Sequence, residues 1–365
     1  MKANKLVPFL LAAVGLLVLP VALNLMGVGN AWIRIIDASL LYVLLALGLN
    51  IVVGYAGLLD LGYVAFYAVG AYLFALLASP HLSNEFPLVQ KWFPGGLHMA
   101  WWMVIPLSAL LAAAFGVLLG APTLKLRGDY LAIVTLGFGE IIRVFMNNLD
   151  RPLNFTNGPA GISGVDAIKM FGHDFSRPLE IFGHEFPSVV IYYYLFLALV
   201  VLSVVICHMI ERSRIGRAWM AIREDEIAAT AMGINTRNLK LLAFGMGATF
   251  GGVSGVMFAS FQGFVSPESF SLQESVLIVA MVVLGGIGHL PGVVVGALLL
   301  AALPEMLRHM VGPLQQMTDG RLDPSIIRQL LIALAMIGIM LLRPRGLWPA
   351  PEHGRVTDGA KLKDA

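Results

Sequence analysis

The feature that most constrains this chain is a series of apolar runs, each long enough or nearly long enough to cross a lipid bilayer as a helix. A bilayer core about 30 Å thick needs about 20 apolar residues per helix. Ten such runs occur, at about 6–26, 35–56, 62–79, 99–120, 130–147, 188–210, 238–261, 273–288, 291–308 and 325–342. With 58% hydrophobic and only 13% charged residues, the composition excludes an ordinary soluble domain. We therefore expect an all-α, polytopic transmembrane bundle of about ten helices.

The basic residues test this arrangement, because they should collect on the loops of one side of the membrane. When ten spans are threaded they do so, and the opposite side carries the long 149–187 loop with its acidic excess. Both termini are then expected to be cytoplasmic. The basic clusters on the common side are Lys2/Lys5, Lys125/Arg127, the 212–240 loop and Arg343/Arg345.

Two of the runs need a closer interpretation. The first is too long for the apolar region of a secretory signal, and no A-x-A cleavage site follows it, so residues 1–34 are expected to hold the first transmembrane helix. The runs 273–288 and 291–308 are separated by a very short turn. They can form either two spans or a broken, re-entrant hairpin.

The motifs that carry most enzyme chemistry are missing. The sequence contains no G-x-x-x-x-G-K-[ST], no complete G-x-G-x-x-G, no H-E-x-x-H, no C-x-x-C and no G-x-S-x-G. Its single cysteine, Cys207, excludes an internal disulfide and a multi-cysteine metal site. We predict no catalytic and no metal-binding residues. A net charge of +2 without a long basic stripe also argues against nucleic-acid binding.

The least membrane-like segment, residues 211–237, lies between the sixth and seventh runs. Apolar residues recur in it at helical spacing on one face, which predicts one short amphipathic helix over 215–233 on the cytoplasmic side. They are Ile215, Trp219, Ile222, Ala229 and Met232. A helix that lies on lipid headgroups would look similar. The acidic cluster 224–226 would repel anionic lipid, however, and favours docking against a protein. The residues of interest are Arg217, Arg223, Glu224, Asp225, Glu226, Ala229 and Gly233.

Several stretches carry a specific resemblance. The run Glu226–Ile234 is similar to the coupling-helix motif of ABC importer permeases, with an acidic residue, two alanines and a glycine a few positions on. Over roughly residues 35–348 the chain resembles the LivM-type branched-chain amino-acid permeases of that class. The stretches that carry this second resemblance are Leu126–Arg143, Asn157–Ile162, Val283–Gly288 and Leu342–Leu347.

The resemblance implies a permease subunit, without enzymatic activity of its own, that moves leucine, isoleucine or valine across a bacterial inner membrane by alternating access. It implies a second related permease, a periplasmic solute-binding protein and two ATP-binding subunits, which hold the ATP and Mg, as partners in the lipid membrane. This chain itself would bind no cofactor. The expected layout is a transmembrane domain over 35–348, with an external loop at 149–187 and a coupling loop at 211–237, followed by a cytoplasmic tail at 349–365. A urea or short-chain amide permease, or an ion-coupled secondary transporter, are the alternatives.

Charged residues within the apolar runs are a second group of candidates. Glu140 and Arg143 stand three residues apart on one helix, close enough to pair. Intramembrane charges usually face a cavity or a partner, so this helix either lines the passage or a helix interface, or carries a structural ion pair. Asp60 is interpreted as an N-cap of the next helix. The other candidates on the 130–147 run are Thr135, Gly137 and Gly139.

Overall fold

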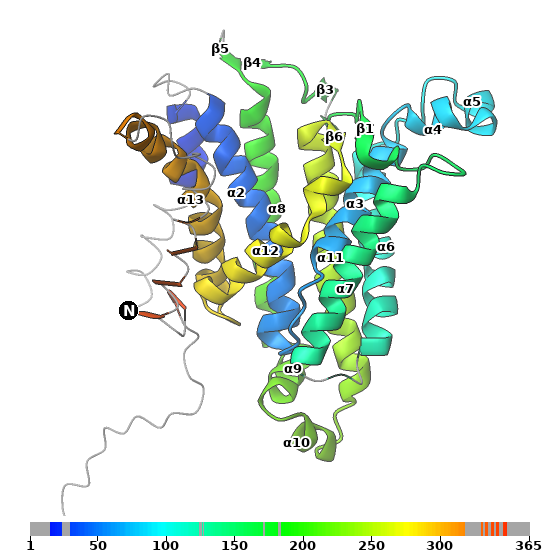
Figure 1. Ribbon diagram of the computed structural model, residues 1–365. Helices are drawn as coiled ribbons and strands as arrows, with labels where there is room; N and C mark the ends of the chain where they lie inside the picture. Colours follow the sequence, from blue (N-terminus) through cyan, green and yellow to red (C-terminus); the bar gives the residue numbers. More distant parts are fainter. Residues whose placement is uncertain are drawn as a thin grey trace, which may run out of the picture.

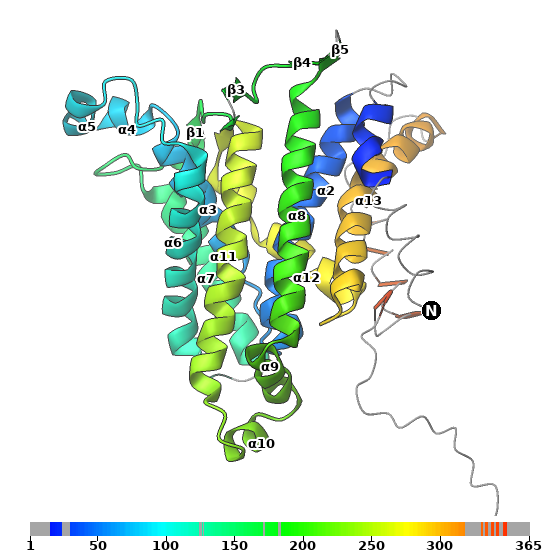
Figure 2. The same cartoon turned by 180° about the vertical axis from the view of Figure 1, so that it is seen from behind.

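The computed structural model describes residues 15–23, 30–123, 126, 128–170, 172–181 and 184–317, with short pieces between 330 and 348. The chain forms a bundle of roughly upright helices (Figure 1), and the same arrangement is seen from behind in Figure 2. The expectation of a mainly helical, multi-span protein is confirmed. The first and last apolar runs lie largely outside the described residues, although residues 15–23 are helical.

Four helical segments are long and apolar enough to cross a membrane. In the first, α2 continues without a break into a π-helix, η1. These four are α2 (Asn30–Leu49) with η1 (Asn50–Tyr55), α6 (Trp101–Thr123), α8 (Ser188–Arg212) and α11 (Thr236–Gln262). The other helices of 14 or more residues are α3 (Val64–Leu77), α7 (Asp129–Asn148), α12 (Leu272–Gly285) and α13 (Leu290–Met317).

Short elements cover the two ends of the bundle. One end carries α4 (His81–Glu85), α5 (Pro87–Trp92), η2 (Gly158–Ala160) and three short antiparallel strand pairs, whereas η3 (Pro267–Phe270) packs against α3 and α7. The other end carries α9 (Arg214–Glu224) and α10 (Glu226–Ala231), so the predicted external and coupling loops lie at opposite ends (Figure 1). The strand pairs are β1 (Ile162–Ser163) with β6 (Phe264–Val265), β2 (Lys169–Met170) with β3 (His173–Asp174), and β4 (Leu179–Ile181) with β5 (His184–Phe186).

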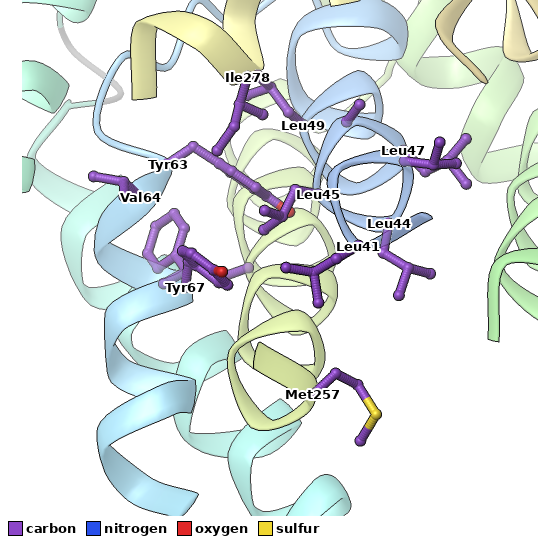
Figure 3. Close-up of a cluster of buried hydrophobic side chains, with 14 of the residues drawn as sticks. Leu41, Leu44, Leu45, Leu47, Leu49, Tyr63, Val64, Tyr67, Met257 and Ile278 are labelled. Atoms are coloured by element: carbon purple, nitrogen blue, oxygen red, sulfur yellow. The ribbon is translucent and has the colours of Figure 1, made fainter. Parts of the chain in front are cut away.

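The centre of the bundle is built by α11, which packs on α2, α3 and α6. Its glycines allow backbones to meet: a Cβ on Gly255 would lie 2.3 Å from the carbonyl oxygen of Tyr67. This is the close helix approach that small residues permit in membranes. Leucines of α2, Tyr63 just before α3, Tyr67 of α3 and Met257 of α11 pack together in this region (Figure 3).

Two helices are shorter than the roughly 20 residues that a membrane-spanning helix needs. α3 begins at Val64 and α12 spans 14 residues, beginning about halfway up the bundle in Figure 1. The backbone of residues 57–63 that leads into α3 is not helical, although most of these residues are buried. A turn at 286–289 connects α12 to the much longer α13, so the 273–308 region is a short helix followed by a long one.

Candidate functional site

The coupling segment folds as two helices, which corrects the prediction of one helix over 215–233. Ser213 starts α9 by accepting a hydrogen bond from the Gly216 amide at 3.1 Å. Asp225 has an extended backbone, and its Oδ1 accepts from the amides of Ile227 and Ala228 at 2.8 and 3.0 Å. An aspartate in this position stabilises a helix N-terminus. It therefore ends α9 and begins α10 at the same residue. We call residues 213–235 the docking loop.

The inner face of the docking loop is partly the predicted one. Trp219, Ile222 and Ala229 are buried, and the Trp219 indole donates to the Leu239 carbonyl at 2.7 Å. Met232, predicted on the same face, is 84% exposed, because the break at Asp225 turns α10 away from α9. Ile227 is also 71% exposed. The free surface of α10 is thus more apolar than the sequence suggested.

Gly233 ends α10. Its φ of +84° is a conformation that favours glycine. The Gly233 amide donates to the Thr230 carbonyl at 3.0 Å, and the Ile234 amide donates to the Ala229 carbonyl at 3.1 Å. Such backward bonds close a helix C-terminus at a left-handed glycine.

Three predicted coupling charges have partners inside the chain. The Glu226 carboxylate pairs with the Lys240 ammonium at 2.6 Å, and the Lys240 side chain is only 7% exposed. Arg223 Nη1 donates to the Gly54 carbonyl at 2.5 Å. Arg217 donates to the Arg212 carbonyl at 2.9 Å, at the C-terminus of α8. Glu224 is exposed and is left on the outer surface.

A cavity of about 250 Å³ lies between the docking loop and the bundle. Ile222, Arg223 and Glu226 form its wall on the loop side, and Lys240 of α11 lies on the bundle side. The wall on the bundle side comes from residues 56–59 and from the start of α7. The docking loop is therefore in contact with the non-helical segment that precedes α3.

The candidates on α7 divide into two groups. Thr135 Oγ1 accepts from the Leu61 amide at 3.0 Å, and Gly139 packs against Gly62, so both hold α7 on residues 60–62. Gly137 has open space around it. Glu140 and Arg143 form the predicted ion pair, at 2.9 Å, and both side chains are about one-third exposed.

The predicted N-cap role of Asp60 is wrong, because Asp60 does not cap α3. Its Oδ1 accepts from the Gly62 amide at 2.9 Å, which forms a turn before the helix. The cap position of α3 is Tyr63, which makes no side-chain cap bond. The second carboxylate oxygen of Asp60 is buried without a hydrogen-bond partner.

Sequence reasoning missed further polar groups inside the bundle. Asp37 is fully buried in α2, and neither carboxylate oxygen has a hydrogen-bond partner. The Tyr42 hydroxyl donates to Glu274 at 2.8 Å, and Asn50 Oδ1 accepts from the Gly288 amide at 2.9 Å. Each is a polar residue in or at the edge of an apolar run. That signal alone marks a residue for attention in a membrane protein.

No group of three or more His, Cys, Asp or Glu residues in the described part of the chain is arranged to hold a metal ion. Cys207 is buried and free. Charged side chains connect the loop at one end of the bundle to the ends of membrane helices, an arrangement through which movement of the loop can reach those helices.

Comparison with known proteins adds independent findings. The model of the family described as "Branched-chain amino acid transport system / permease component" matches residues 32–342. The chain is 42% identical over 348 residues to the high-affinity branched-chain amino acid transport system permease protein LivM of Escherichia coli (strain K12), covering 92% of this chain and 74% of that protein. It is 24% identical over 321 residues to the permease protein LivH of the same kind of system from Salmonella typhimurium, covering 86% of this chain and 93% of that one. No solved structure matches the chain.

Proposed function

The chain belongs to the family of branched-chain amino acid transport system permease components, and from this premise we propose that its docking loop receives the ATP-hydrolysing subunits of an importer. As a permease component, the chain is a membrane subunit of an ABC transport system and not its catalytic subunit. In the proposal, ATP and Mg are bound by two partner subunits. Their closure moves the docking loop, and α8 and α11 follow because they are attached to it.

The observation that carries the proposal is the surface of α10. The six-residue helix α10 exposes Ile227, and Met232 just after it is exposed as well, while the charged residue Glu226 is paired inward. Exposed apolar side chains gathered at one place usually mark a protein contact. The proposed contact also includes Glu224, Asp225 and Gly233, which are all exposed.

The remaining partners follow from the family. The chain matches both LivM and LivH proteins, which are the two permeases named for one kind of system. We therefore propose that a second, LivH-like permease pairs with this chain in a bacterial inner membrane, with both termini cytoplasmic. A periplasmic solute-binding protein would dock on the end formed by residues 149–187.

The proposed solutes are leucine, isoleucine and valine, as the names of the relatives suggest. A urea or short-chain amide permease is the second candidate. Polar residues and two glycines of the bundle are the proposed lining of the passage or of the interface with the second permease. The polar residues are Asp60, Thr135, Glu140, Arg143 and Glu274, and the glycines are Gly137 and Gly139.

The proposal is tested with Ile227→Asp. A charge in the apolar contact should reduce co-purification of the ATP-hydrolysing subunits by about tenfold or more, since burying an unpaired charge is costly. Leu88→Asp is the matched control, because Leu88 is a similarly exposed apolar residue at the opposite end of the bundle. Ile227 is a sharper target than Ala229, which is buried, or Gly233, whose positive φ strains any replacement.

Unchanged assembly of Ile227→Asp would contradict the docking assignment. The solute is tested separately, with the complete transporter in proteoliposomes supplied with ATP. Uptake of leucine, isoleucine or valine, without uptake of urea, is the expected result. Uptake of urea but of none of the three amino acids would favour the second candidate, and uptake by this chain alone without ATP would overturn the importer mechanism.

A further inference from the structure

The end of the first described span is closed by a residue from the docking loop. The last carbonyls of a helix lack partners within the helix. At the end of η1, the Ala56 amide donates to Ile51 and the Leu58 amide donates to Val52. The Gly54 carbonyl instead accepts from the guanidinium of Arg223, which is 169 residues further along the chain.

This contact suits the chemistry of both partners. α2 and η1 form one 26-residue helix, whose C-terminus carries a partial negative charge. Arginine stays charged at all physiological pH values and offers several donors in a fixed plane. Arg223 is therefore a cap that the helix could not supply from its own sequence.

The same arginine touches two other segments. Its side-chain carbons lie against Gly57, where an added Cβ would be 2.9 Å from Cγ of Arg223. Its Nη1 lies against Gly288 in the turn between α12 and α13, where an added Cβ would be only 2.7 Å away. Both glycines have positive φ, so a side chain at either position would be strained and would also lie too close to Arg223.

The two segments are also joined directly. Asn50, the first residue of η1, accepts from the Gly288 amide at 2.9 Å. The end of η1, the start of the 56–63 segment and the 286–289 turn therefore meet at one junction, with Arg223 in it. A π-helix within an α-helix is rare and frequently marks a functional site. Here it lies where the docking loop touches the bundle.

We propose that Arg223 is a positioning residue that transmits movement of the docking loop to this junction. The proposal rests on the ATPase-docking function of the loop. In it, α9 moves the end of η1 and the 286–289 turn through the Arg223–Gly54 hydrogen bond, in addition to the direct pull on α8 and α11. The bond is made in one state of the transport cycle and released in the other, since only a contact that differs between two states can couple them.

The test uses the complete transporter in proteoliposomes and measures solute moved per ATP hydrolysed. Arg223→Gln should assemble with the ATP-hydrolysing subunits and hydrolyse ATP. It should move about tenfold less solute per ATP, a typical size for coupling between sites. Arg223→Lys keeps the charge and can still donate a hydrogen bond, and should recover part of the loss. Arg214→Gln is the control, because Arg214 is an exposed arginine at the start of α9 that is not among the predicted coupling residues.

A second variant keeps the proposal falsifiable if Arg223→Gln does not fold. Asn50→Leu cuts the Asn50–Gly288 bond at the same junction without altering the docking loop, and should lower solute moved per ATP as well. A wild-type ratio in Arg223→Gln, or in Asn50→Leu when the first variant is unfolded, would overturn the proposal. So would a loss in Arg223→Gln that Arg214→Gln reproduces. Failure of the docking function has a separate readout, since it leaves Ile227→Asp assembled.

Discussion

Lys240 and Glu226 form an ion pair. Removing Glu226 should destabilise α10 by a very different amount than removing Lys240. The Lys240 side chain is 7% exposed, whereas that of Glu226 is 30% exposed, and their charged atoms are 2.6 Å apart. A buried charge left without its partner costs much more than one that water can reach. The two single substitutions therefore leave behind charges in unequal surroundings.

The difference can be worked out from the surroundings of each group. Glu226→Gln leaves a buried ammonium in the first turns of α11, where the helix dipole also opposes it. Removing one partner of a buried pair costs about 3 kcal/mol. Lys240→Met leaves a carboxylate that is partly hydrated and that starts α10, where the dipole favours it; this costs about 1 kcal/mol. The gap of about 2 kcal/mol corresponds to roughly a 30-fold difference in the opening equilibrium of α10.

Hydrogen exchange of the amides of residues 226–231 in the purified protein measures this opening. Glu226→Gln should speed their exchange much more than Lys240→Met does, and the double variant should exchange more slowly than Glu226→Gln alone. Glu224→Gln, at an exposed neighbouring position, is the control and should leave the rates unchanged. Equal effects of the two single variants, or a larger effect of Lys240→Met, would refute the reasoning.

Two further predictions concern other parts of the molecule. Gly62→Ala places a Cβ 1.9 Å from the Thr135 carbonyl oxygen, so thermal unfolding of this variant should show a destabilisation of about 1–3 kcal/mol or more. Gly137→Ala is the control, because Gly137 has open space around it, and it should be neutral or slightly stabilising. The His98–Asp166 hydrogen bond raises the pKa of His98, so the stability it adds is present below the ordinary His pKa of about 6.5 and is lost as pH rises through the raised value. The difference in Tm between the wild type and His98→Asn should shrink as the buffer is made alkaline, and a pH-independent difference would contradict this.

The positions of the long helices could be predicted, because an apolar run of spanning length has few other uses. The path of the chain between the runs 35–56 and 62–79 could not. Residues 56–63 are apolar and mostly buried, yet they are not helical, because their polar backbone groups find partners such as Thr135 and Ser275 on other elements. Apolarity reports burial, and over a short stretch it does not distinguish a helix from an irregular buried segment. The run 62–79 therefore located α3 to within two residues at each end, but it did not show that the chain before it is buried.

The break at Asp225 was visible in principle. An aspartate followed by good helix formers is a start signal for a helix. The prediction treated Glu224, Asp225 and Glu226 as one acidic cluster on a continuous helix, and the structure gives each a different role. Asp225 caps, Glu226 pairs with Lys240, and Glu224 stays exposed. The capping bonds of Asp225 therefore divide the segment into two helices.

Three charged residues of the docking loop, Arg217, Arg223 and Glu226, bond to helices of the bundle, and the exposed surface of its second helix is partly apolar. Both features have a physical origin. The ends of membrane helices concentrate unpaired carbonyls and dipole charge at the edge of the bundle. Charged side chains of a loop that covers these ends find their best partners there, as Arg217 and Arg223 do. Apolar residues that remain outside, such as Ile227 and Met232, are then available for another protein. A single sequence shows which residues are charged but not which helix end each one will meet, because the partner of Arg223 lies 169 residues away.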